Sequence, residues 1–393
     1  MDHFIFHAPT KIIFGKNSEL QCAHLLREFG AHKVLVHYGG NSALRSGLLH
    51  RICQCLQEAD IPYVTLGGVK PNPRLSKVRE GIALAQQEDV DFLLAVGGGS
   101  VIDSAKAIAY GCANEGDVWD YYAKKKTVRA ALPVGCVATM AAAGSEMSNS
   151  TVITNEDGWL KRGLSSSFGY CRFAILNPEL TVTVPPYQTM SGCTDILMHT
   201  LERYFTRETP MELVDGISYA LMKDVIKYAR ILQNDPRNYA ARAEILWASE
   251  LSHNGVSGDR SLGDWACHQL EHELSGMFDV AHGAGLAAVW GSWARYVLDA
   301  DPARFAQLAI HVWDIPACDD VRACALQGIE AMETFFSQIG MPICLPQLGI
   351  SLTDAQIDEL AEKCTFFRQR TIGGFRTLDL EDIRRIYHAA NQR

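Results

Sequence analysis

The first half of the chain alternates short apolar segments with longer segments that have the period of a helix. Apolar runs at residues 33–38, 63–66 and 92–96 are each followed by a glycine-containing turn. Helical periodicity then covers residues 48–58, 75–88 and 101–110. A strand, a turn and a helix that repeat about every 25 to 30 residues are typical of βαβ units. The pattern therefore predicts an α/β domain with a parallel sheet.

The pattern changes at the Pro185-Pro186 pair, which marks a linker or a helix start. Helical periodicity dominates from there to the end of the chain, with apolar faces at residues 187–205, 213–232, 239–252, 264–275 and 283–298. We therefore predict two domains, an α/β domain at residues 1–183 and an all-helical domain at residues 184–393. A ligand cleft between the two is expected.

Two of the predicted strands end in turns that suit phosphate. Gly39, Gly40, Asn41 and Ser42 follow the strand at 33–38, and the sequence GGGS at 97–100 lies between the strand at 92–96 and a helix. Backbone N–H groups at such a helix start can bind a phosphate group. The spaced G-x-G-x-x-G fingerprint is absent from the sequence, and glycine clusters are often plain turns. Small residues at 141–148 allow either a ligand or a neighbouring helix to approach closely.

Composition excludes several classes of function. The chain has 393 residues, 48% of them hydrophobic and 21% charged, with a net charge of -9, which argues against nucleic acid or an anionic membrane as the main partner. No apolar run reaches the roughly 20 residues of a membrane span, and the N-terminal sequence does not resemble a signal peptide. The 12 cysteines are scattered without a C-x-x-C motif, as in a reducing compartment. A cytoplasmic protein is expected.

Candidate metal ligands gather in the helical half. Asp195 and His199 are four residues apart, as are His268 and His272, so each pair shares one helix face, while His282 precedes Gly283 where a turn is expected. One carboxylate and three imidazoles suit Zn²⁺ or Fe²⁺, and a fourth histidine is left for proton transfer. A single such pair is more often a surface or core feature. Cys267 is a possible soft ligand, although adjacent helix positions point in different directions.

These residues together resemble the iron-containing (group III) alcohol dehydrogenase family, and its butanol-dehydrogenase-like branch in particular. The resemblance covers nearly the whole chain and includes FIFHAPTKIIFG at 4–15, YGGNS at 38–42, PNP at 71–73, GGGSVIDSAKAIA at 97–109, AGSEMS at 143–148 and NPELTVTVPP at 177–186. It implies the dehydroquinate synthase-like fold, with an α/β dinucleotide-binding domain before an all-α metal-binding domain, and a homodimer.

The resemblance also implies roles for individual residues. The implied metal ligands are Asp195, His199, His268 and His282. His272 corresponds to the family's active-site histidine that is not a ligand. The implied cofactor-binding residues are Gly39, Gly40, Asn41, Ser42, Asn72, Gly98, Gly99, Ser100, Asp103, Thr139 and Lys161. The family frequently has T-T-x-G-T-G-S-E where this chain has TMAAAGSE at 139–146, and glycine where it has Asn17, which leaves the nicotinamide contacts open.

The implied activity is reversible hydride transfer between primary alcohols and aldehydes, with NAD(P) and one Fe²⁺ or Zn²⁺ ion. The turn at 39–42 lacks the carboxylate that accepts a hydrogen bond from the ribose 2′-hydroxyl in NAD-preferring relatives, which favours NADP(H), although a pocket that accepts both cofactors is an alternative. Other hypotheses are a glycerol-dehydrogenase-like enzyme, a lyase of the dehydroquinate-synthase type and a non-catalytic nucleotide-binding protein. Glycerol dehydrogenases typically lack the histidine at the position of His199, and the lyase needs a basic cluster for its phosphorylated substrate. The four candidate ligands argue against a non-catalytic protein.

Overall fold

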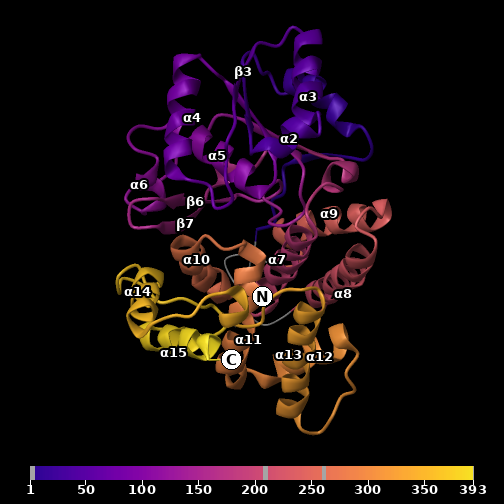
Figure 1. The fold of residues 1–393 in the computed structure, drawn as a ribbon, viewed down its shortest axis with the longest axis vertical. Helices are drawn as coiled ribbons and strands as arrows, with labels where there is room; N and C mark the ends of the chain where they lie inside the picture. The colour runs from indigo at the N-terminus through magenta and orange to yellow at the C-terminus, as the bar shows by residue number, and fades with distance from the viewer. Residues whose placement is uncertain (1–4, 207–210, 259–262, 393) are drawn as a thin grey trace. The chain divides into compact units, whose positions relative to one another are not determined.

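The computed structural model describes residues 5–206, 211–258 and 263–392 and divides into two compact units. The first unit comprises residues 8–184. The second begins at Pro185, runs to the C-terminal end of the chain and also takes in residues 5–7 (Figure 1). The N-terminal residues thus group with the helical unit, whereas the sequence analysis assigned them to the α/β domain.

The first unit is built on a parallel sheet with the strand order β1-β8-β5-β4-β2-β3. The strands are β1 (Lys11–Phe14), β2 (Val34–Tyr38), β3 (Tyr63–Leu66), β4 (Phe92–Gly97), β5 (Val134–Ala138) and β8 (Phe173–Leu176). All five pairs of neighbours run in parallel. Every residue of β4 and β5 is buried, as expected for strands that are covered on both faces. The predicted parallel α/β sheet is confirmed.

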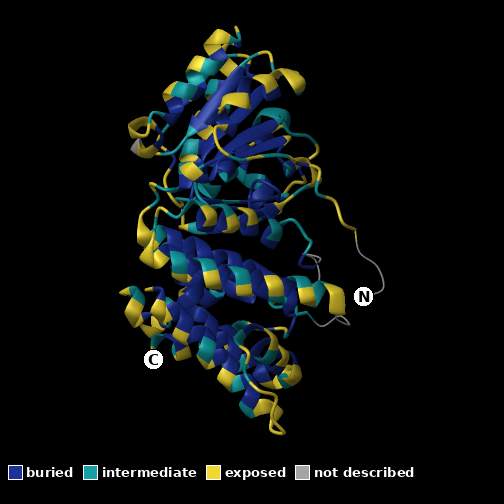
Figure 2. Cartoon of the chain, turned by 90° about the vertical axis from the view of Figure 1, so that its right-hand side faces the viewer, coloured by how far each residue is buried: buried dark blue, intermediate teal, exposed yellow. Residues whose placement is uncertain are grey.

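Helices bury the two faces of this sheet. The helices of this unit are α1 (Cys22–Glu28), α2 (Asn41–Arg45), α3 (Leu48–Glu58), α4 (Leu75–Gln87), α5 (Gly99–Ala113) and α6 (Trp119–Tyr122). Leu25 of α1 and Ile52 of α3 pack in one apolar cluster with Phe92 and Leu94 of β4 and with Phe173 of β8. Figure 2 shows this sheet as a continuous buried layer. The hydrophobic pattern of the strands therefore sets the core of the unit.

An antiparallel hairpin interrupts the α/β pattern, and the sequence analysis did not predict it. Its strands are β6 (Ser150–Asn155) and β7 (Leu160–Ser165). Gly158 and Trp159 both have positive φ, 79° and 51°, in the turn. The N–H of Thr154 donates to the carbonyl of Pro73, so the hairpin is tied to the loop that follows β3. The two strands carry few alternating apolar residues, which is why period-2 patterning did not reveal them.

The side chain of His37 connects β2 to β3 and to α5 by hydrogen bonds. Its side chain is fully buried, Nδ1 lies 2.9 Å from the carbonyl oxygen of Leu66, and Nε2 lies 2.9 Å from the hydroxyl of Ser104. A carbonyl can only accept, so Nδ1 carries the proton and Nε2 accepts from Ser104. Burial lowers the pKa of His37 to about 4 from the usual 6.5, and the folded protein therefore holds this ring neutral.

This neutral ring predicts a loss of stability in mild acid. Below pH 6.5 the unfolded chain protonates His37, whereas the folded chain does so only near pH 4. The free energy of unfolding should therefore fall as the pH drops from 6.5 to 4, by up to roughly 3 kcal/mol from this group. Urea titrations of the wild type and His37→Asn test it, because asparagine can donate and accept but does not titrate. An equal pH slope in both proteins would contradict the prediction.

The second unit is built mainly of helices over its described residues, as predicted, with isolated β-bridges between Thr206 and Gly263 and between Ile372 and Leu378. Its helices are α7 (Pro186–Tyr204), α8 (Glu212–Asn234), α9 (Tyr239–His253), α10 (Ala266–Phe278), α11 (His282–Val297), α12 (Pro302–Trp313), α13 (Val321–Gln338), α14 (Asp354–Cys364) and α15 (Leu380–Asn391). Every residue of α7 from Thr189 to Tyr204 is buried, so this helix forms the centre of the unit. One prediction is corrected, because His282 opens α11 rather than lying in a turn.

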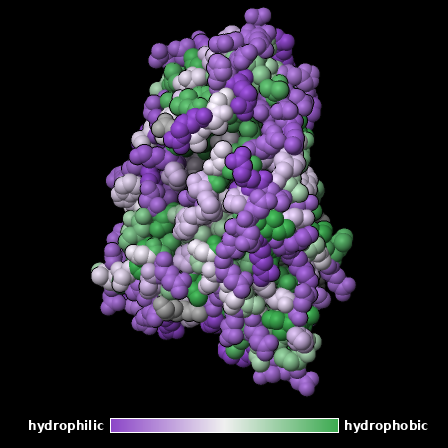
Figure 3. All heavy atoms as spheres, turned by 45° about the vertical axis from the view of Figure 1, so that its right-hand side comes forward, coloured by the Kyte–Doolittle hydropathy of each residue, from purple (hydrophilic) through white to green (hydrophobic). Residues whose placement is uncertain are grey.

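In the part of the chain that the structure describes, no helix is both long and apolar enough to cross a bilayer. On the face drawn in Figure 3, hydrophilic residues predominate and apolar residues are scattered among them, which is normal for exposed protein surface.

Candidate metal centre

Helix α7 presents three polar side chains from the interior of the second unit. Asp195, His199 and Glu202 are spaced four and then three residues apart, which places them on one face. All three are buried, with relative exposures of 2%, 3% and 1%. Carboxylates and imidazoles are seldom buried without a bound ion or a charged partner, so this face of α7 is a candidate site.

Helices α10 and α11 supply the remaining histidines. Helix α10 starts after Trp265, which has a left-handed backbone with φ 61°, and it presents His268 and His272 one turn apart. It ends before Asp279, whose φ of 54° reverses the chain. The chain then enters α11 at His282, its first residue. The short link between the helices returns His282 towards His268, and the two ring centroids lie 5.2 Å apart.

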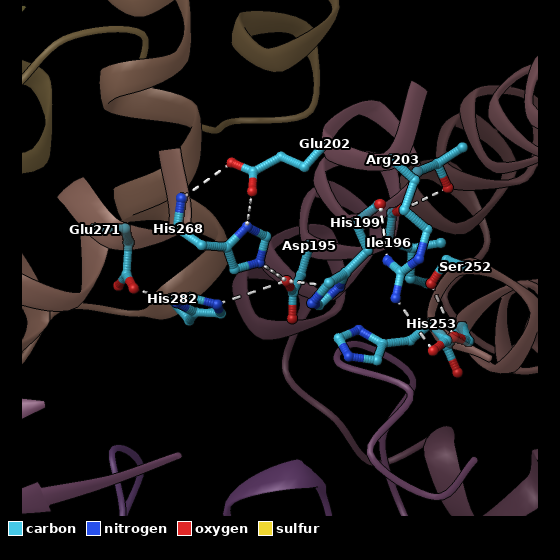
Figure 4. Close-up of polar contacts among 12 residues, drawn as sticks. Asp195, Ile196, His199, Glu202, Arg203, Ser252, His253, His268, Glu271 and His282 are labelled. Carbon is cyan, nitrogen blue, oxygen red and sulfur yellow. Dashed lines mark hydrogen bonds and ion pairs between the residues drawn. The ribbon is translucent and has the colours of Figure 1, made fainter. Parts of the chain in front are cut away.

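Asp195 lies at the centre of this cluster (Figure 4). Its Oδ1 atom is 3.2 Å from Nδ1 of His199, 3.7 Å from Nε2 of His268 and 3.7 Å from Nε2 of His282. The ligand atoms of Asp195, His268 and His282 lie within 4.8 Å of one another. The ring of His199 packs on His268 at 4.6 Å between centroids. The four residues that the sequence analysis put forward as ligands therefore lie in one place.

The arrangement fits a divalent ion. Ligands that lie about 2.1 Å from a tetrahedral ion are roughly 3.4 Å apart, which is close to the spacings around Asp195. Oδ1 of Asp195 and Nε2 of His268 make no hydrogen bond of normal geometry among the described residues, although both are buried. Since buried polar atoms are normally satisfied, an ion between them would explain both. One carboxylate with imidazoles suits Zn²⁺ or Fe²⁺.

Two buried glutamates orient the histidines from outside, and the sequence analysis missed both. Oε2 of Glu202 lies 3.1 Å from Nδ1 of His268, and its Oε1 accepts the backbone N–H of the same residue. Glu271 pairs in the same way with Nδ1 of His282. Such carboxylates fix the tautomer of a ligand histidine, so that Nε2 faces the metal. The signal was in the sequence, since Glu202 lies seven residues after Asp195 on the same face of α7.

The carboxylates also control the charge of His268. Burial alone would lower its pKa, but Glu202 and Asp195 more than offset that effect and raise the pKa to about 9. The pKa of the Asp264 carboxyl group is also raised, to about 7, first by burial and then by the negative charge of Glu202. This excess of buried negative charge favours a bound cation.

His272 lies beside the ligand cluster. Its ring centroid is 6.5 Å from that of His268 and 6.0 Å from that of His282. His272, Glu271 and His282 form a second group of close ligand atoms. The side chain of His282 is 27% exposed, whereas those of Asp195, His199 and His268 are nearly fully buried. The cluster is therefore most exposed on the side of His282.

The ring of a further histidine, His253, packs against that of His199. The ring of His253, the last residue of α9, meets that of His199 edge to face at 4.1 Å. Arg203 donates to the carbonyls of both His199 and His253, at 3.1 and 3.2 Å, and its guanidinium lies over the ring of Trp265. The sequence analysis did not single out His253, because none of its candidate ligands lies on α9.

Cys267 lies next to His268 but outside the ligand group. The groups of close ligand atoms found among the described residues contain carboxylates and imidazoles only. Cys267 is fully buried, and burial raises the pKa of its thiol well above the usual value, so the neutral thiol persists at neutral pH. The structure therefore gives no support to Cys267 as a soft ligand.

The candidate phosphate-binding turns lie at one end of the parallel sheet in the first unit. Strands β2 and β4 pair in parallel, with Tyr38 opposite Val96, so the turns that follow them share an edge. Gly40 precedes α2, and Gly98 precedes α5. A Cβ atom at Gly39 would lie 3.5 Å from Val101 of α5. The carboxyl edge of a parallel sheet, with helix N-termini beside it, is where α/β folds bind nucleotides.

The other predicted cofactor-binding residues lie at several points of the same unit. Gly99 and Ser100 form the first turn of α5, and Ser42 is exposed on α2. The N–H of Thr139 donates to the carbonyl of Gly97. Asn72 is buried with φ 52°, and Lys161 is buried on β7. The side chain of Asn41 lies outside the described part of the structure.

The side chain of Asp103 makes two hydrogen bonds within the first unit that the sequence did not predict. One of its carboxylate oxygens accepts from the Ser145 hydroxyl at 2.6 Å, and the other accepts from the Val152 N–H at 2.9 Å. These bonds tie α5 to the segment between β5 and β6. A contact with the cofactor by Asp103 remains a prediction.

Comparison with known proteins settles the family. Residues 9–178 match the model of the iron-containing alcohol dehydrogenases, and residues 189–391 match the C-terminal model of the Fe-containing alcohol dehydrogenase family. The chain belongs to the iron-containing alcohol dehydrogenase family. The predicted resemblance is thereby confirmed.

Individual relatives cover the full length of the chain. It is 39% identical over 391 residues to the probable NADH-dependent butanol dehydrogenase 1 of Bacillus subtilis, covering 99% of this chain and 100% of that protein. It is 33% identical to the NADPH-dependent aldehyde reductase YqhD of Escherichia coli, covering 99% of this chain and 100% of the reductase. Among solved structures, the NADH-dependent butanol dehydrogenase A of Thermotoga maritima superposes with a TM-score of 0.95 at 36% identity, covering 100% and 99% of the two chains.

Proposed function

We propose that this protein is a metal-dependent, NAD(P)-linked alcohol dehydrogenase and aldehyde reductase that catalyses reversible hydride transfer between primary alcohols and aldehydes. The observation that carries the proposal is the buried cluster of Asp195 with three imidazoles, set within a full-length match to the family. Relatives named as butanol dehydrogenases and as an aldehyde reductase support the substrate class.

The residues of the cluster would hold the ion and prepare the site. Bound there, a divalent ion would supply Lewis-acid polarisation of the substrate oxygen, and a bound nicotinamide would exchange the hydride. Asp195, His199, His268 and His282 are the proposed ligands. Carboxylate oxygens of Glu202 and Glu271 lie beside Nδ1 of His268 and His282, an arrangement that would direct Nε2 of each ring to the ion.

His272 is the proposed proton carrier. It lies beside His282, the ligand with the most exposed side chain. Aldehyde reduction consumes a proton and alcohol oxidation releases one, and imidazole is a side chain that commonly carries such a proton in catalysis. The His272 side chain would therefore move a proton between the substrate oxygen and solvent.

Replacement of this histidine should slow turnover while the metal stays in place. His272→Ala is expected to lower kcat by roughly 10²- to 10⁴-fold, the range for loss of a general acid or base, and to change the pH profile. The exposed His50 provides a matched control, His50→Ala, which should behave as wild type. Steady-state rates across pH and metal content test this. A normal rate and pH profile in His272→Ala would remove His272 from the mechanism.

NADP(H) is the proposed preferred cofactor. The turn at residues 39–42 carries no carboxylate, so nothing in it repels a 2′-phosphate, and Ser42 can donate a hydrogen bond to one. The names of relatives divide on this point, since the Bacillus subtilis butanol dehydrogenase is named for NADH and the Escherichia coli reductase for NADPH. The ratio of kcat/KM for NADPH and NADH decides between them.

Of the alternatives, the lyase hypothesis is the least supported. A phosphorylated substrate needs free cations near the metal, yet Arg203, the arginine that follows Glu202 on α7, binds the carbonyls of His199 and His253. A glycerol-dehydrogenase-like activity predicts NAD-linked oxidation of polyols, and a non-catalytic role predicts bound metal without turnover. A measurement of turnover with NADPH and with NADH distinguishes both alternatives from the proposal.

The test of the proposal is oxidation of NADPH and NADH with butyraldehyde, before and after chelation and after Zn²⁺ or Fe²⁺ is added back. We expect oxidation that chelation abolishes and metal restores, with NADPH favoured. Preference for NADH would overturn the cofactor proposal and leave the metal proposal standing. No turnover with either cofactor, across several aldehydes and both metals, would contradict the proposed activity.

Location and assembly are proposed on other grounds. A cytoplasmic location is proposed from the scattered cysteines without a C-x-x-C motif, and a homodimer is proposed from the family resemblance. Cell fractionation and light scattering test these two proposals. A monomer at micromolar concentration would contradict the second.

A further inference from the structure

Lys106 is a lysine buried in the first unit. It lies on α5, and only 1% of it is exposed. Lysine is almost never fully buried unless its charge is satisfied. Its ammonium group must therefore have a structural partner or a function, and nothing in the proposed mechanism uses it.

The partners of this ammonium group all belong to one segment. Nζ of Lys106 donates to the carbonyls of Ser145 at 2.6 Å, Ser148 at 2.8 Å and Ser150 at 3.2 Å, and it lies 3.2 Å from the Ser145 hydroxyl. These residues lead from the loop after β5 into β6. The ammonium group of Lys106 thus binds three carbonyls of a segment that has no regular secondary structure before β6.

Two acidic groups accompany Lys106. Asp103, one helical turn earlier on α5, binds the Ser145 hydroxyl and the Val152 N–H. Glu146 is buried as well, and burial raises the pKa of its carboxyl group to about 7 despite the nearby Lys106. Its carbonyl accepts from the Thr10 hydroxyl at 3.2 Å. The segment is therefore held by α5 on one side and by the chain before β1 on the other.

The loop that this segment anchors lies against the glycine turn before α5. The N–H of Thr139 donates to the Gly97 carbonyl at 3.1 Å. A Cβ atom added at Gly98 would lie 3.3 Å from Cβ of Met140, and one added at Gly99 would lie 3.2 Å from Cβ of Ala143. The loop at residues 139–144 therefore lines one side of the turn whose N–H groups are suited to a pyrophosphate.

We propose that Lys106 is a positioning residue for the nicotinamide cofactor, because it fixes the loop at 139–150 against the glycine turn at 97–100. This inference rests on the proposed use of that turn for NAD(P). Lys106 itself would not touch the cofactor. Its effect should therefore appear in cofactor affinity and not in metal affinity, since the candidate ligands belong to the second unit.

The experiment compares Lys106→Met with the wild type and with Lys125→Met. Methionine keeps an unbranched apolar side chain and removes every donor, whereas Lys125 is exposed on the same unit and serves as the matched control. Dissociation constants of NADPH and NADH are measured by nucleotide fluorescence on metal-stripped protein, and Zn²⁺ affinity is measured by chelator competition. We expect Lys106→Met to weaken cofactor binding by about tenfold or more, with Zn²⁺ affinity unchanged, and Lys125→Met to match the wild type.

Ser145→Ala keeps the test decisive if Lys106→Met does not fold. This variant removes the hydroxyl that joins Asp103 to Lys106 but leaves the three backbone acceptors in place, and we expect a smaller loss of cofactor affinity, about threefold. Unchanged cofactor affinity in folded Lys106→Met would overturn the positioning role. If Lys106→Met does not fold, unchanged cofactor affinity in Ser145→Ala would overturn it. An equal loss of cofactor and Zn²⁺ affinity would also overturn it. Failure of the wild type to bind either nucleotide would instead contradict the proposed function, and this inference with it.

Discussion

Asp195→Asn is expected to lose both the bound metal and aldehyde reduction. Asp195 is the one carboxylate among the four proposed ligands, and its Oδ1 faces the three imidazoles at 3.2 to 3.7 Å. Asparagine keeps the shape of the side chain but removes the negative charge that offsets a dication. Loss of a residue that only orients a ligand lowers metal affinity by roughly 10- to 100-fold. The loss of Asp195 itself should exceed that range.

Chelator competition with Zn²⁺ measures the affinity, and activity at saturating metal measures the catalytic part. Asp319 is exposed in the same unit, so Asp319→Asn controls for the change of charge and should resemble the wild type. Glu202→Gln should fall between the two, because it weakens the hold on His268 and leaves all four proposed ligands in place. Wild-type metal content and activity in Asp195→Asn would contradict the assignment.

Gly283→Ala is expected to damage the site without altering any proposed ligand. Gly283 follows His282 in the first turn of α11, and a Cβ atom there would lie 1.9 Å from the Ser191 carbonyl oxygen of α7. The two helices touch backbone to backbone at this point, so a methyl group must push them apart. We expect a loss of about 1 to 3 kcal/mol in the free energy of unfolding from overpacking. Metal affinity should also fall, since His282 moves away from Asp195.

The matched control is Gly216→Ala on α8, where no heavy atom lies within 4 Å of the added Cβ. Alanine is a better helix former than glycine, so this variant should gain about 0.5 to 1 kcal/mol. Urea unfolding and Zn²⁺ affinity of both variants provide the comparison. If Gly283→Ala keeps the stability and the affinity of the wild type, the close contact between α7 and α11 does not position His282.

The local features of the fold were accessible from the sequence. Apolar runs such as Phe92 to Val96 are strands that are buried on both faces, and this type of strand is a nearly continuous hydrophobic run, here followed by a glycine turn. Proline at 185 and 186 marks the start of α7 because the ring suits the first turn of a helix. The pairing of Asp195 with His199 follows from helical spacing alone.

Features that depend on tertiary contacts were not accessible. Spacing could not show that α7, α10 and α11 converge, and the prediction of one metal site rested on the resemblance at that point. The roles of Glu271 and His253 exist only because other helices bring His282 and His199 to them. The β6–β7 hairpin was missed because its residues do not alternate in hydrophobicity. The sequence analysis did not single out Lys106, because the carbonyls that it binds come from a separate segment of the chain.

The most direct test of the central claim is a metal titration of the stripped protein, in which bound Zn²⁺ and the rate of aldehyde reduction are followed together. The account predicts that activity rises in proportion to bound metal and stops rising at one ion per chain. His268→Ala should show neither the tight binding nor the rise. Full activity in protein that holds no metal, or tight binding of one ion in His268→Ala, would contradict the assignment of the Asp195 cluster as the catalytic metal site.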